Sequence, residues 1–230
     1  MQPCWRKTQL NNPRTILYGS QTSLGKAWEK LHPCSQQVDG TSPEHERVIH
    51  AGAAAKWARG KAQLLCVDGI NHLSRIGETR YEDKDILLRN VFNPYMFVNE
   101  LVRMDAAPMR CVFVVSQTYR IPQRTTSLYC ASKAALAHMV KVMARELAPS
   151  GWVINGLAPG KIVDTKMAEM TDAQVLKLRG WKKKDADKYA LAMIPAGRFT
   201  NTKEVCEAIE WLFNAPEYIN GTIIDMTGGV

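Results

Sequence analysis

The apolar residues along the chain predict strands and helices that alternate. Short apolar runs rich in β-branched residues predict buried strands at 15–19, 63–69, 111–115 and 152–160. Apolar residues three or four positions apart predict helices at 24–31, 84–102 and from Tyr129 to the stop at 149–151. Pro94 is expected to bend the second of these helices. Alternation of this kind predicts an α/β domain whose mainly parallel sheet carries helices on both faces.

The remaining segments complete this outline. A strand is predicted at 34–40, a helix at 43–62, a helix from about Thr202 and a last strand in the segment 219–229. Residues 1–14 are expected to form an N-terminal extension, because Pro13 suits a central strand badly. Residues 15–230 are expected to form a single domain. Residues 166–197 are polar and charged, and we expect them to form a lid over the substrate.

Three residues in the middle of the chain suggest a chemical site. Ser116 follows the strand 111–115, and Tyr129 and Lys133 lie four positions apart on the next predicted helix, so they share one face. A phenol has a pKa of ~10, and an ammonium ~4 Å away is expected to lower it toward ~7. Tyr129 would then exchange protons near neutral pH, beside a Ser116 hydroxyl that holds a substrate oxygen. The alternative is a surface Tyr and Lys on an ordinary amphipathic helix.

The turn after the first strand offers a phosphate site. A strand, a glycine turn and a helix N-terminus direct free backbone N–H groups at an anion. The phosphate loop of nucleoside triphosphatases requires Gly, four residues, then Gly-Lys and a hydroxyl residue. Here five residues separate Gly19 from Gly25, and Ala27 follows Lys26, which excludes that motif.

With these residues in place, the chain resembles the short-chain dehydrogenase/reductase family, from about Thr15 to Gly229. Residues 18–25 resemble the family's glycine motif, with Tyr18 for Thr and Ser23 for the middle Gly. Residues 66–70 retain only Gly69 of the family's N-N-A-G sequence, and the first half of the chain is shorter than is typical of the family. Asn155 with Pro159-Gly160 resembles its N-x-x-x-P-G motif.

The resemblance implies a Rossmann-like, doubly wound fold and hydride transfer between NAD(H) or NADP(H) and a carbonyl or alcohol. It implies that Tyr129 is the acid/base and that Lys133 lowers its pKa and binds the nicotinamide ribose. Ser116 would hold the substrate oxygen, and Asn90 would support the proton relay. The implied cofactor-binding residues are Gly19, Gln21, Ser23, Leu24, Gly25, Asp39, Gly69, Tyr129, Lys133, Pro159, Gly160, Ile162 and Thr165. It also implies homodimers or homotetramers built through the helices that carry Asn90 and Tyr129.

Two acidic residues keep alternative interpretations. If 34–39 is the second strand, Asp39 would bind the adenosine ribose and favour NAD. If it is the third strand, Asp39 would approach the adenine ring, and a plain turn before Gly40 is the structural alternative. We favour NAD slightly. Asp68 could bond a ribose or an amide, or cap its loop.

Composition sets limits on other functions. Of the 230 residues, 46% are hydrophobic and 23% charged, which is ordinary for a globular chain, and no apolar run is long enough to span a membrane. The six cysteines are scattered and are expected to be reduced thiols, with no metal site. The formal charge of +8 is spread out, so we expect no nucleic-acid partner. A cytoplasmic location is expected, because residues 1–14 lack the apolar core of a signal peptide.

A rival interpretation from another class is a retired enzyme that keeps the fold and a regulatory or nucleotide-binding role. Ser23, the altered N-N-A-G segment and the short first half favour it. The presence of Ser116, Tyr129 and Lys133 together opposes it.

Overall fold

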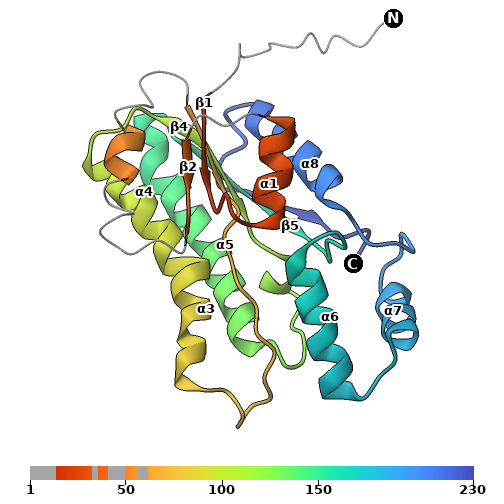
Figure 1. Cartoon of the computed structure of the whole chain (residues 1–230). Coiled ribbons are helices and arrows are strands. Elements are labelled where there is room, and N and C mark those ends of the chain that lie inside the picture. Colours follow the sequence, from red (N-terminus) through yellow and green to blue (C-terminus); the bar gives the residue numbers. More distant parts are fainter. Residues whose placement is uncertain (1–13, 33–35, 41–49, 56–61) are drawn as a thin grey trace, which may run out of the picture.

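A computed structural model describes residues 14–32, 36–40, 50–55 and 62–230 (Figure 1). Its strands are β1 (Arg14–Tyr18), β2 (Gln36–Val38), β3 (Ala62–Cys66), β4 (Met109–Val114), β5 (Val153–Pro159) and β6 (Ile223–Met226). They form one sheet in the order β2-β1-β3-β4-β5-β6, and every pair of neighbours is parallel. The fold is therefore the predicted Rossmann-like α/β fold.

Helices cover both faces of this sheet. The α-helices are α1 (Ser23–Leu31), α3 (Asp85–Leu87), α4 (Asn93–Arg103), α5 (Ser127–Leu147), α6 (Lys166–Arg179), α7 (Lys183–Ala192) and α8 (Thr202–Asn214), and residues 50–55 are also helical. Short 3-10 turns are η1 (Tyr81–Lys84), η3 (Gln117–Tyr119) and η4 (Ala148–Ser150). Figure 1 shows α1 and α8 on one side of the sheet and α4 and α5 on the other.

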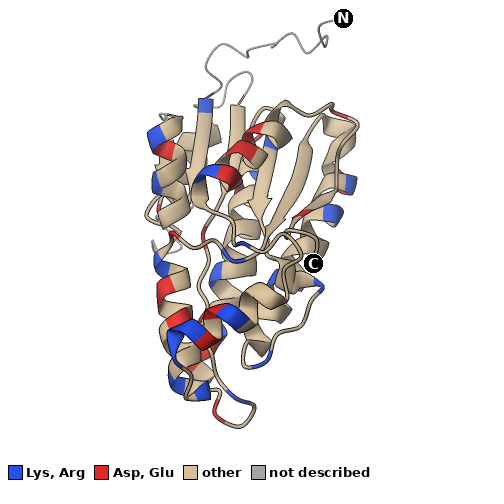
Figure 2. Ribbon diagram, turned by 90° about the vertical axis from the view of Figure 1, so that its right-hand side faces the viewer, with Lys and Arg blue, Asp and Glu red and all other residues tan. Residues whose placement is uncertain are grey.

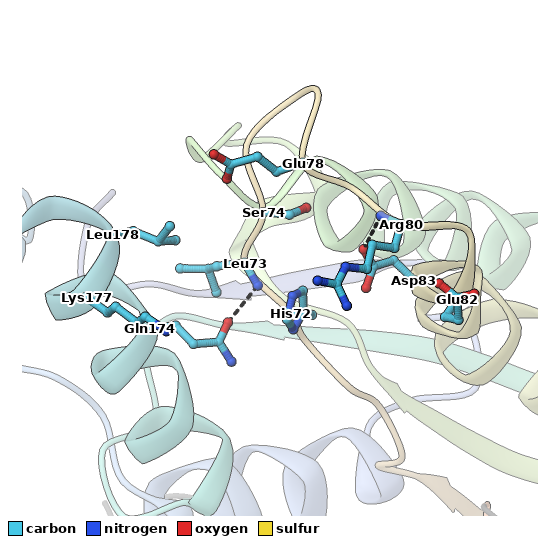
Figure 3. A pocket seen from close by; sticks show the side chains of 10 residues that line it. All are labelled: His72, Leu73, Ser74, Glu78, Arg80, Glu82, Asp83, Gln174, Lys177 and Leu178. Carbon is cyan, nitrogen blue, oxygen red and sulfur yellow. Dashed lines mark hydrogen bonds between the residues drawn. The ribbon is translucent and has the colours of Figure 1, made fainter.

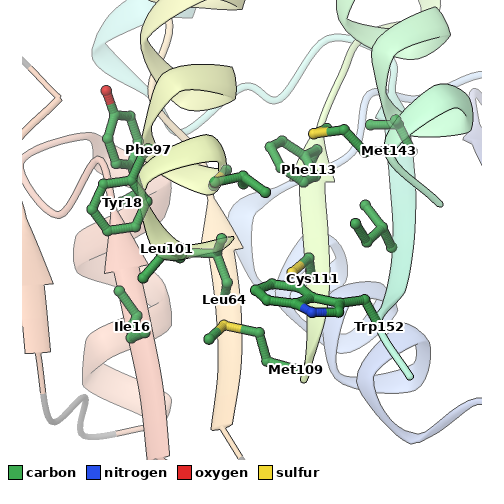
Figure 4. Packing of buried hydrophobic residues seen from close by; sticks show 14 of the residues in the cluster. Ile16, Tyr18, Leu64, Phe97, Leu101, Met109, Cys111, Phe113, Met143 and Trp152 are labelled. Atoms are coloured by element: carbon green, nitrogen blue, oxygen red, sulfur yellow. The ribbon is translucent and has the colours of Figure 1, made fainter. Parts of the chain in front are cut away.

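The strands distribute their side chains between two cores with a period of two. Leu64, Cys111 and Phe113 point into the core under α4 and α5, where they meet Phe97 and Leu101 of α4 (Figure 4). The residues between them, such as Leu65 and Val112, pack with the apolar face of α1 and α8. This alternation is what a strand buried on both faces requires.

The helix that carries Asn90 is not regular. The chain passes from η1 through α3 into a π-helical turn, η2 (Leu88–Phe92), and then into α4. Pro94 cannot donate a backbone N–H to the preceding turn, and a π-turn widens the helix at such a point. The irregularity next to Pro94 is thus a π-turn in the residues just before it.

Several predicted boundaries need adjustment. The strand expected at 63–69 is β3 at 62–66, so the helix expected at 43–62 cannot include Ala62, and most of that helix lies outside the described residues. The expected extension, residues 1–14, lies outside them too, apart from Arg14, which begins β1. The segment expected to be a lid, 166–197, forms α6 and α7.

The structure also bears on what the sequence analysis expected of the cysteines, of metal binding and of membrane-spanning segments. Cys66, Cys111, Cys130 and Cys206 are free thiols, and all but Cys130 are buried, as expected. The described residues contain no cluster of metal-ligating side chains. None of the described helices combines the length and apolar character that crossing a membrane requires.

Phe113 gives a direct test of the core between the sheet and α4 and α5. It is fully buried in β4, so Phe113→Ala should lower the free energy of unfolding by about 3–5 kcal/mol. Leu31→Ala, at a half-exposed position, should change it by less than about 0.5 kcal/mol. Chemical denaturation of both variants measures the difference, and equal losses would contradict this packing.

Candidate active site

The candidate site lies where the strand order reverses. The chain runs from β1 outward to β2 and then returns to β3 on the other side of β1. In open parallel sheets, ligands bind beyond the carboxyl ends of the strands at this switch point. Gly19, Asp68, Ser116 and Gly160 follow β1, β3, β4 and β5 there.

The turn after β1 has the geometry of an anion cradle. Gly19 has φ +94°, and a Cβ there would lie 2.5 Å from the backbone nitrogen of Asp68. Thr22 caps α1, since its hydroxyl accepts from the Gly25 N–H at 3.0 Å and donates to the Gly19 carbonyl at 2.8 Å. No acidic side chain occupies the first turn of α1, so the positive end of the helix remains available to an anion.

Ser23 replaces a family glycine without visible strain. It is the first residue of α1, and its φ is not positive. Its hydroxyl accepts a hydrogen bond of 3.1 Å from the backbone N–H of Lys166, the first residue of α6. The replaced position therefore connects the turn after β1 to the start of α6.

Other expected cofactor contacts lie around this turn. Gln21 is exposed in the turn, whereas Leu24 points into the core under α1 and α8. β2 pairs directly with β1, and the Gly19 N–H donates to the Val38 carbonyl at 2.8 Å. Asp39 therefore follows the strand beside β1, which is the place that the second-strand interpretation requires.

Asp68 is held by an ion pair. Its side chain is 3% exposed, and its Oδ1 accepts from Arg89 Nη2 at 2.9 Å. Its Oδ2 is also buried, and the described residues offer it no hydrogen-bond partner. A Cβ at Gly40 would lie 2.1 Å from that oxygen, so glycine at 40 makes room for the carboxylate. The pairing with Arg89 could not be predicted from spacing, because the two residues lie in separate elements.

Asn90 is fully buried in the π-turn and connects two elements. Its Oδ1 accepts from the Ile70 N–H at 2.7 Å, and its Nδ2 donates to the Ile70 carbonyl at 2.9 Å. The same Nδ2 lies 3.0 Å from Ser132 Oγ, which donates to the Tyr129 carbonyl at 2.7 Å. Asn90 thus fixes the loop after β3 against α5. Sequence analysis did not single out Ser132, although it lies on the helix between Tyr129 and Lys133.

Ser116, Tyr129 and Lys133 come together as expected. The Ser116 hydroxyl lies close enough to the Tyr129 phenol to favour its ionisation, and both side chains are buried. Lys133 Nζ donates to the Val114 carbonyl at 3.0 Å and lies 5.8 Å from the centre of the Tyr129 ring. A Cβ at Gly69 would touch Lys133 Nζ at 3.4 Å and would lie closer, at 3.2 Å, to Asn90 Oδ1, so the loop passes near both side chains.

The pKa of Tyr129 does not shift in the direction expected from spacing. Burial raises the pKa of the phenol to about 12, and the hydrogen bond from Ser116 opposes this only in part. Burial also lowers the pKa of Lys133 to about 8, while the negative charge of Asp68 acts in the opposite direction. The phenol is therefore protonated at neutral pH, and Lys133 remains mostly charged.

The segment after β5 borders the site from the other side. Pro159 ends β5, and the Gly160 N–H donates to the Met226 carbonyl at 2.9 Å. Ile162 forms an isolated bridge with Thr200. Thr165 caps α6: its hydroxyl accepts from the Ala168 N–H at 3.1 Å and donates to the Ile162 carbonyl at 3.0 Å. That hydroxyl therefore has a structural task besides the cofactor contact expected of it.

Helix α6, in the segment expected to form a lid, is held to the loop after β3 by hydrogen bonds. Gln174 Oε1 accepts from the Leu73 N–H at 2.7 Å, and Arg75 donates to the Leu178 carbonyl at 3.1 Å. Between the loop and α6 lies a cavity of about 640 Å³ lined mainly by polar and charged side chains (Figure 3). Lys183 pairs with Asp172 at 3.3 Å and with Asp187 at 3.2 Å, so part of the basic triplet 182–184 is neutralised within the lid.

Comparison with known proteins identifies the family. A family profile described as "Enoyl-(Acyl carrier protein) reductase" matches residues 24–230. The chain belongs to the short-chain dehydrogenase/reductase family. It is 30% identical over 168 residues to the 3-oxoacyl-(acyl-carrier-protein) reductase of Thermotoga maritima, covering 70% of this chain and 63% of that protein. It is 26% identical over 192 residues to the gluconate 5-dehydrogenase of Gluconobacter oxydans, covering 81% and 71%.

Solved short-chain dehydrogenase structures share the fold. A gluconate 5-dehydrogenase from Beutenbergia cavernae, described as NAD(P) dependent and with bound NADP, aligns with a TM-score of 0.77 at 20% identity over 94% of this chain and 95% of that one. The sequence matches are shorter than the structural ones. They span 38%, 63% and 71% of three curated relatives.

The Asp68–Arg89 pair generates a stability prediction. Arg89→Met would leave a buried carboxylate without its counter-ion, so the free energy of unfolding should fall by about 3 kcal/mol. In Lys203→Met the lost ion pair is with Glu207, and the two side chains are 77% and 62% exposed, so the loss should stay below about 1 kcal/mol. Denaturant titration compares the two variants, and a small loss for Arg89→Met would argue against the buried pair.

Proposed function

We propose that this chain is an NAD(P)-dependent oxidoreductase that interconverts a small carbonyl compound and its alcohol. The observation that carries the proposal is the meeting of Ser116, Tyr129 and Lys133 at the carboxyl edge of the sheet, with Asn90 fixing the loop beside them. The site also fits a dinucleotide. The turn at Gly19 leaves backbone N–H groups for phosphates, and Asp68 Oδ2 is a buried acceptor at the switch point.

When bound, the nicotinamide cofactor supplies or receives the hydride, and the protein orients the groups around it. In the reducing direction the Ser116 hydroxyl donates to the carbonyl oxygen of the substrate, and Tyr129 gives that oxygen its proton. A pKa of about 12 keeps this proton on the phenol until the substrate oxygen becomes basic. The Lys133 ammonium stabilises the phenolate that remains. One of its three N–H donors bonds to the Val114 carbonyl, and the others are available to a ribose hydroxyl.

The cofactor site follows the same proposal. Gly19, Gln21, Ser23, Leu24 and Gly25 would approach the pyrophosphate, and Gly69, Pro159, Gly160, Ile162 and Thr165 would border the nicotinamide half. Asp39, beside the turn, would bind the adenosine ribose and favour NAD over NADP, since a carboxylate repels a 2′-phosphate.

The charged surface gives little support for a nucleic-acid partner. Figure 2 shows basic and acidic residues interspersed along the helices, and Lys161, Lys183 and Arg198 pair with carboxylates. A small-molecule substrate beside Ser116 and Tyr129 therefore remains the proposed partner.

The site favours catalysis over a retired binding role. The Ser23–Lys166 hydrogen bond is the observation that fits a retired protein best, because it occupies a turn where a glycine would leave open space. A retired protein would bind NADH or NADPH without turnover.

Tyr129→Phe should lower the rate of carbonyl reduction at least ~100-fold, because the phenylalanine has no proton to give. The affinity for cofactor should change less than about twofold. The measurement is NADH or NADPH oxidation with a panel of ketones, and Tyr218→Phe, at a fully exposed position, is the control. Retained turnover in Tyr129→Phe would remove the acid/base role.

Asp39→Ala should weaken NADH binding about 10- to 100-fold and bring the affinities for NADH and NADPH closer together, because the ribose loses a charged acceptor. Calorimetric titration of both cofactors measures this. Glu217→Ala, at an exposed residue beyond α8, is the control. An unchanged preference would place Asp39 outside the ribose site.

An exposed apolar stripe supports a homo-oligomer. Leu88, Phe92, Tyr95 and Val102 lie three, four or seven positions apart along η2 and α4 and are 38–50% exposed. The partner that the resemblance implies for this face is a second copy of the chain. Phe92→Glu should therefore convert a dimer or tetramer to smaller species in sedimentation experiments, whereas Tyr218→Glu should not. A monomeric parent protein would contradict the assembly.

A further inference from the structure

The hydroxyl of Ser116 receives two hydrogen bonds from one residue. Ser116 follows β4 and caps the 3-10 turn η3, so its Oγ accepts from the backbone N–H of Thr118 at 3.3 Å. The Thr118 hydroxyl donates to the same oxygen at 3.0 Å. Ser116 is 8% exposed and Thr118 is 5% exposed, so water has little access to replace either bond.

These two bonds restrict what the Ser116 hydroxyl can do. A serine hydroxyl has one proton to donate and two lone pairs to accept with. Thr118 uses both lone pairs, which leaves only the O–H for the side of the site where Tyr129 lies. In this arrangement Ser116 can donate to the Tyr129 oxygen or to a substrate oxygen, but it has no lone pair with which to accept from either.

We propose that Thr118 is a positioning residue that makes Ser116 an obligate hydrogen-bond donor toward Tyr129 and the substrate carbonyl. The inference rests on the proposed function and adds a residue to it. Without a hydroxyl donor at 118, Ser116 could accept a hydrogen bond from the phenol, and the phenol O–H would then point away from the substrate. With Thr118 in place, the proton of Tyr129 stays available for the substrate oxygen.

The side chain at 118 is suited to this task for two separate reasons. The backbone N–H of residue 118 donates to Ser116 whatever side chain stands there, because Ser116 caps η3. Only the hydroxyl fills the second lone pair, and valine has nearly the same shape without that hydroxyl. Thr118→Val therefore removes one donor and leaves the packing and the cap in place. Thr118→Ser keeps the donor and removes a methyl group.

The test compares Thr118→Val, Thr118→Ser and the unsubstituted parent chain in cofactor-dependent carbonyl reduction. Thr118→Val should lower kcat about tenfold, the effect of one ordinary hydrogen bond on a barrier, while the Kd for cofactor stays within about twofold. Thr118→Ser should recover most of the rate. Thr126→Val removes another buried hydroxyl, which bonds to Gln123 and Cys130 instead, and should behave like the parent.

A second measurement requires no turnover. The ionisation of Tyr129 is followed by ultraviolet absorbance during a pH titration, with Tyr129→Phe subtracted to isolate its signal. In Thr118→Val the pKa of Tyr129 should rise, because the neutral phenol can then donate to the free lone pair of Ser116, which stabilises the protonated form. Thr118→Ser should titrate like the parent.

The outcomes separate the inference from the proposed function. A parent protein that neither binds cofactor nor turns over a carbonyl overturns the proposed function, and the titration of Tyr129 then still decides the role of Thr118. Unchanged kcat in Thr118→Val, or an unchanged Tyr129 titration, overturns the inference. Equal losses in Thr118→Val and Thr118→Ser would show that Thr118 acts only through packing, which also overturns it.

Discussion

The geometry of the site depends on the way Asn90 holds the backbone of Ile70. A buried amide that donates to and accepts from one residue fixes both the position and the direction of that segment. The π-turn at 88–92 places the amide there, and its third contact, with Ser132, continues to the Tyr129 carbonyl. The loop after β3, the π-turn and α5 therefore form one hydrogen-bonded unit. Gly69 lies within it, and a Cβ there would lie 3.2 Å from Asn90 Oδ1, close enough to disturb that amide.

Burial controls the electrostatics of this unit. It disfavours the charged form of each group, so it raises the pKa of Tyr129 and lowers that of Lys133. Asp68 moderates the effect on Lys133, and Arg89 in turn compensates the buried carboxylate. The chain thus places a neutral phenol beside a mostly charged amine at neutral pH. This is a suitable starting state for giving a proton to a carbonyl oxygen.

Much of this arrangement is predictable from the sequence, and the remainder has a physical reason. Strands β1, β3, β4 and β5 follow from apolar runs, and the i, i+4 spacing of Tyr129 and Lys133 predicts their shared face. Spacing carries no information on burial, so the expectation that Lys133 lowers the pKa of Tyr129 did not include the larger effect of burial. The pairs Asp68–Arg89 and Ser23–Lys166 join residues from separate elements, and only the folded topology brings them together. The end of the helix expected at 43–62 was wrong because Ala62 adjoins the apolar run of β3, and a sequence pattern does not fix the boundary between two elements to the residue.

The central claim is that the altered glycine motif still forms a working cofactor site beside Tyr129. The most direct measurement is a fluorescence titration of the wild-type chain with NADH and with NADPH, following the nicotinamide signal. The account predicts saturable binding of at least one cofactor, with NADH preferred. Absence of binding to both at millimolar concentration would contradict it and would leave the retired, non-catalytic role as the better explanation of the fold.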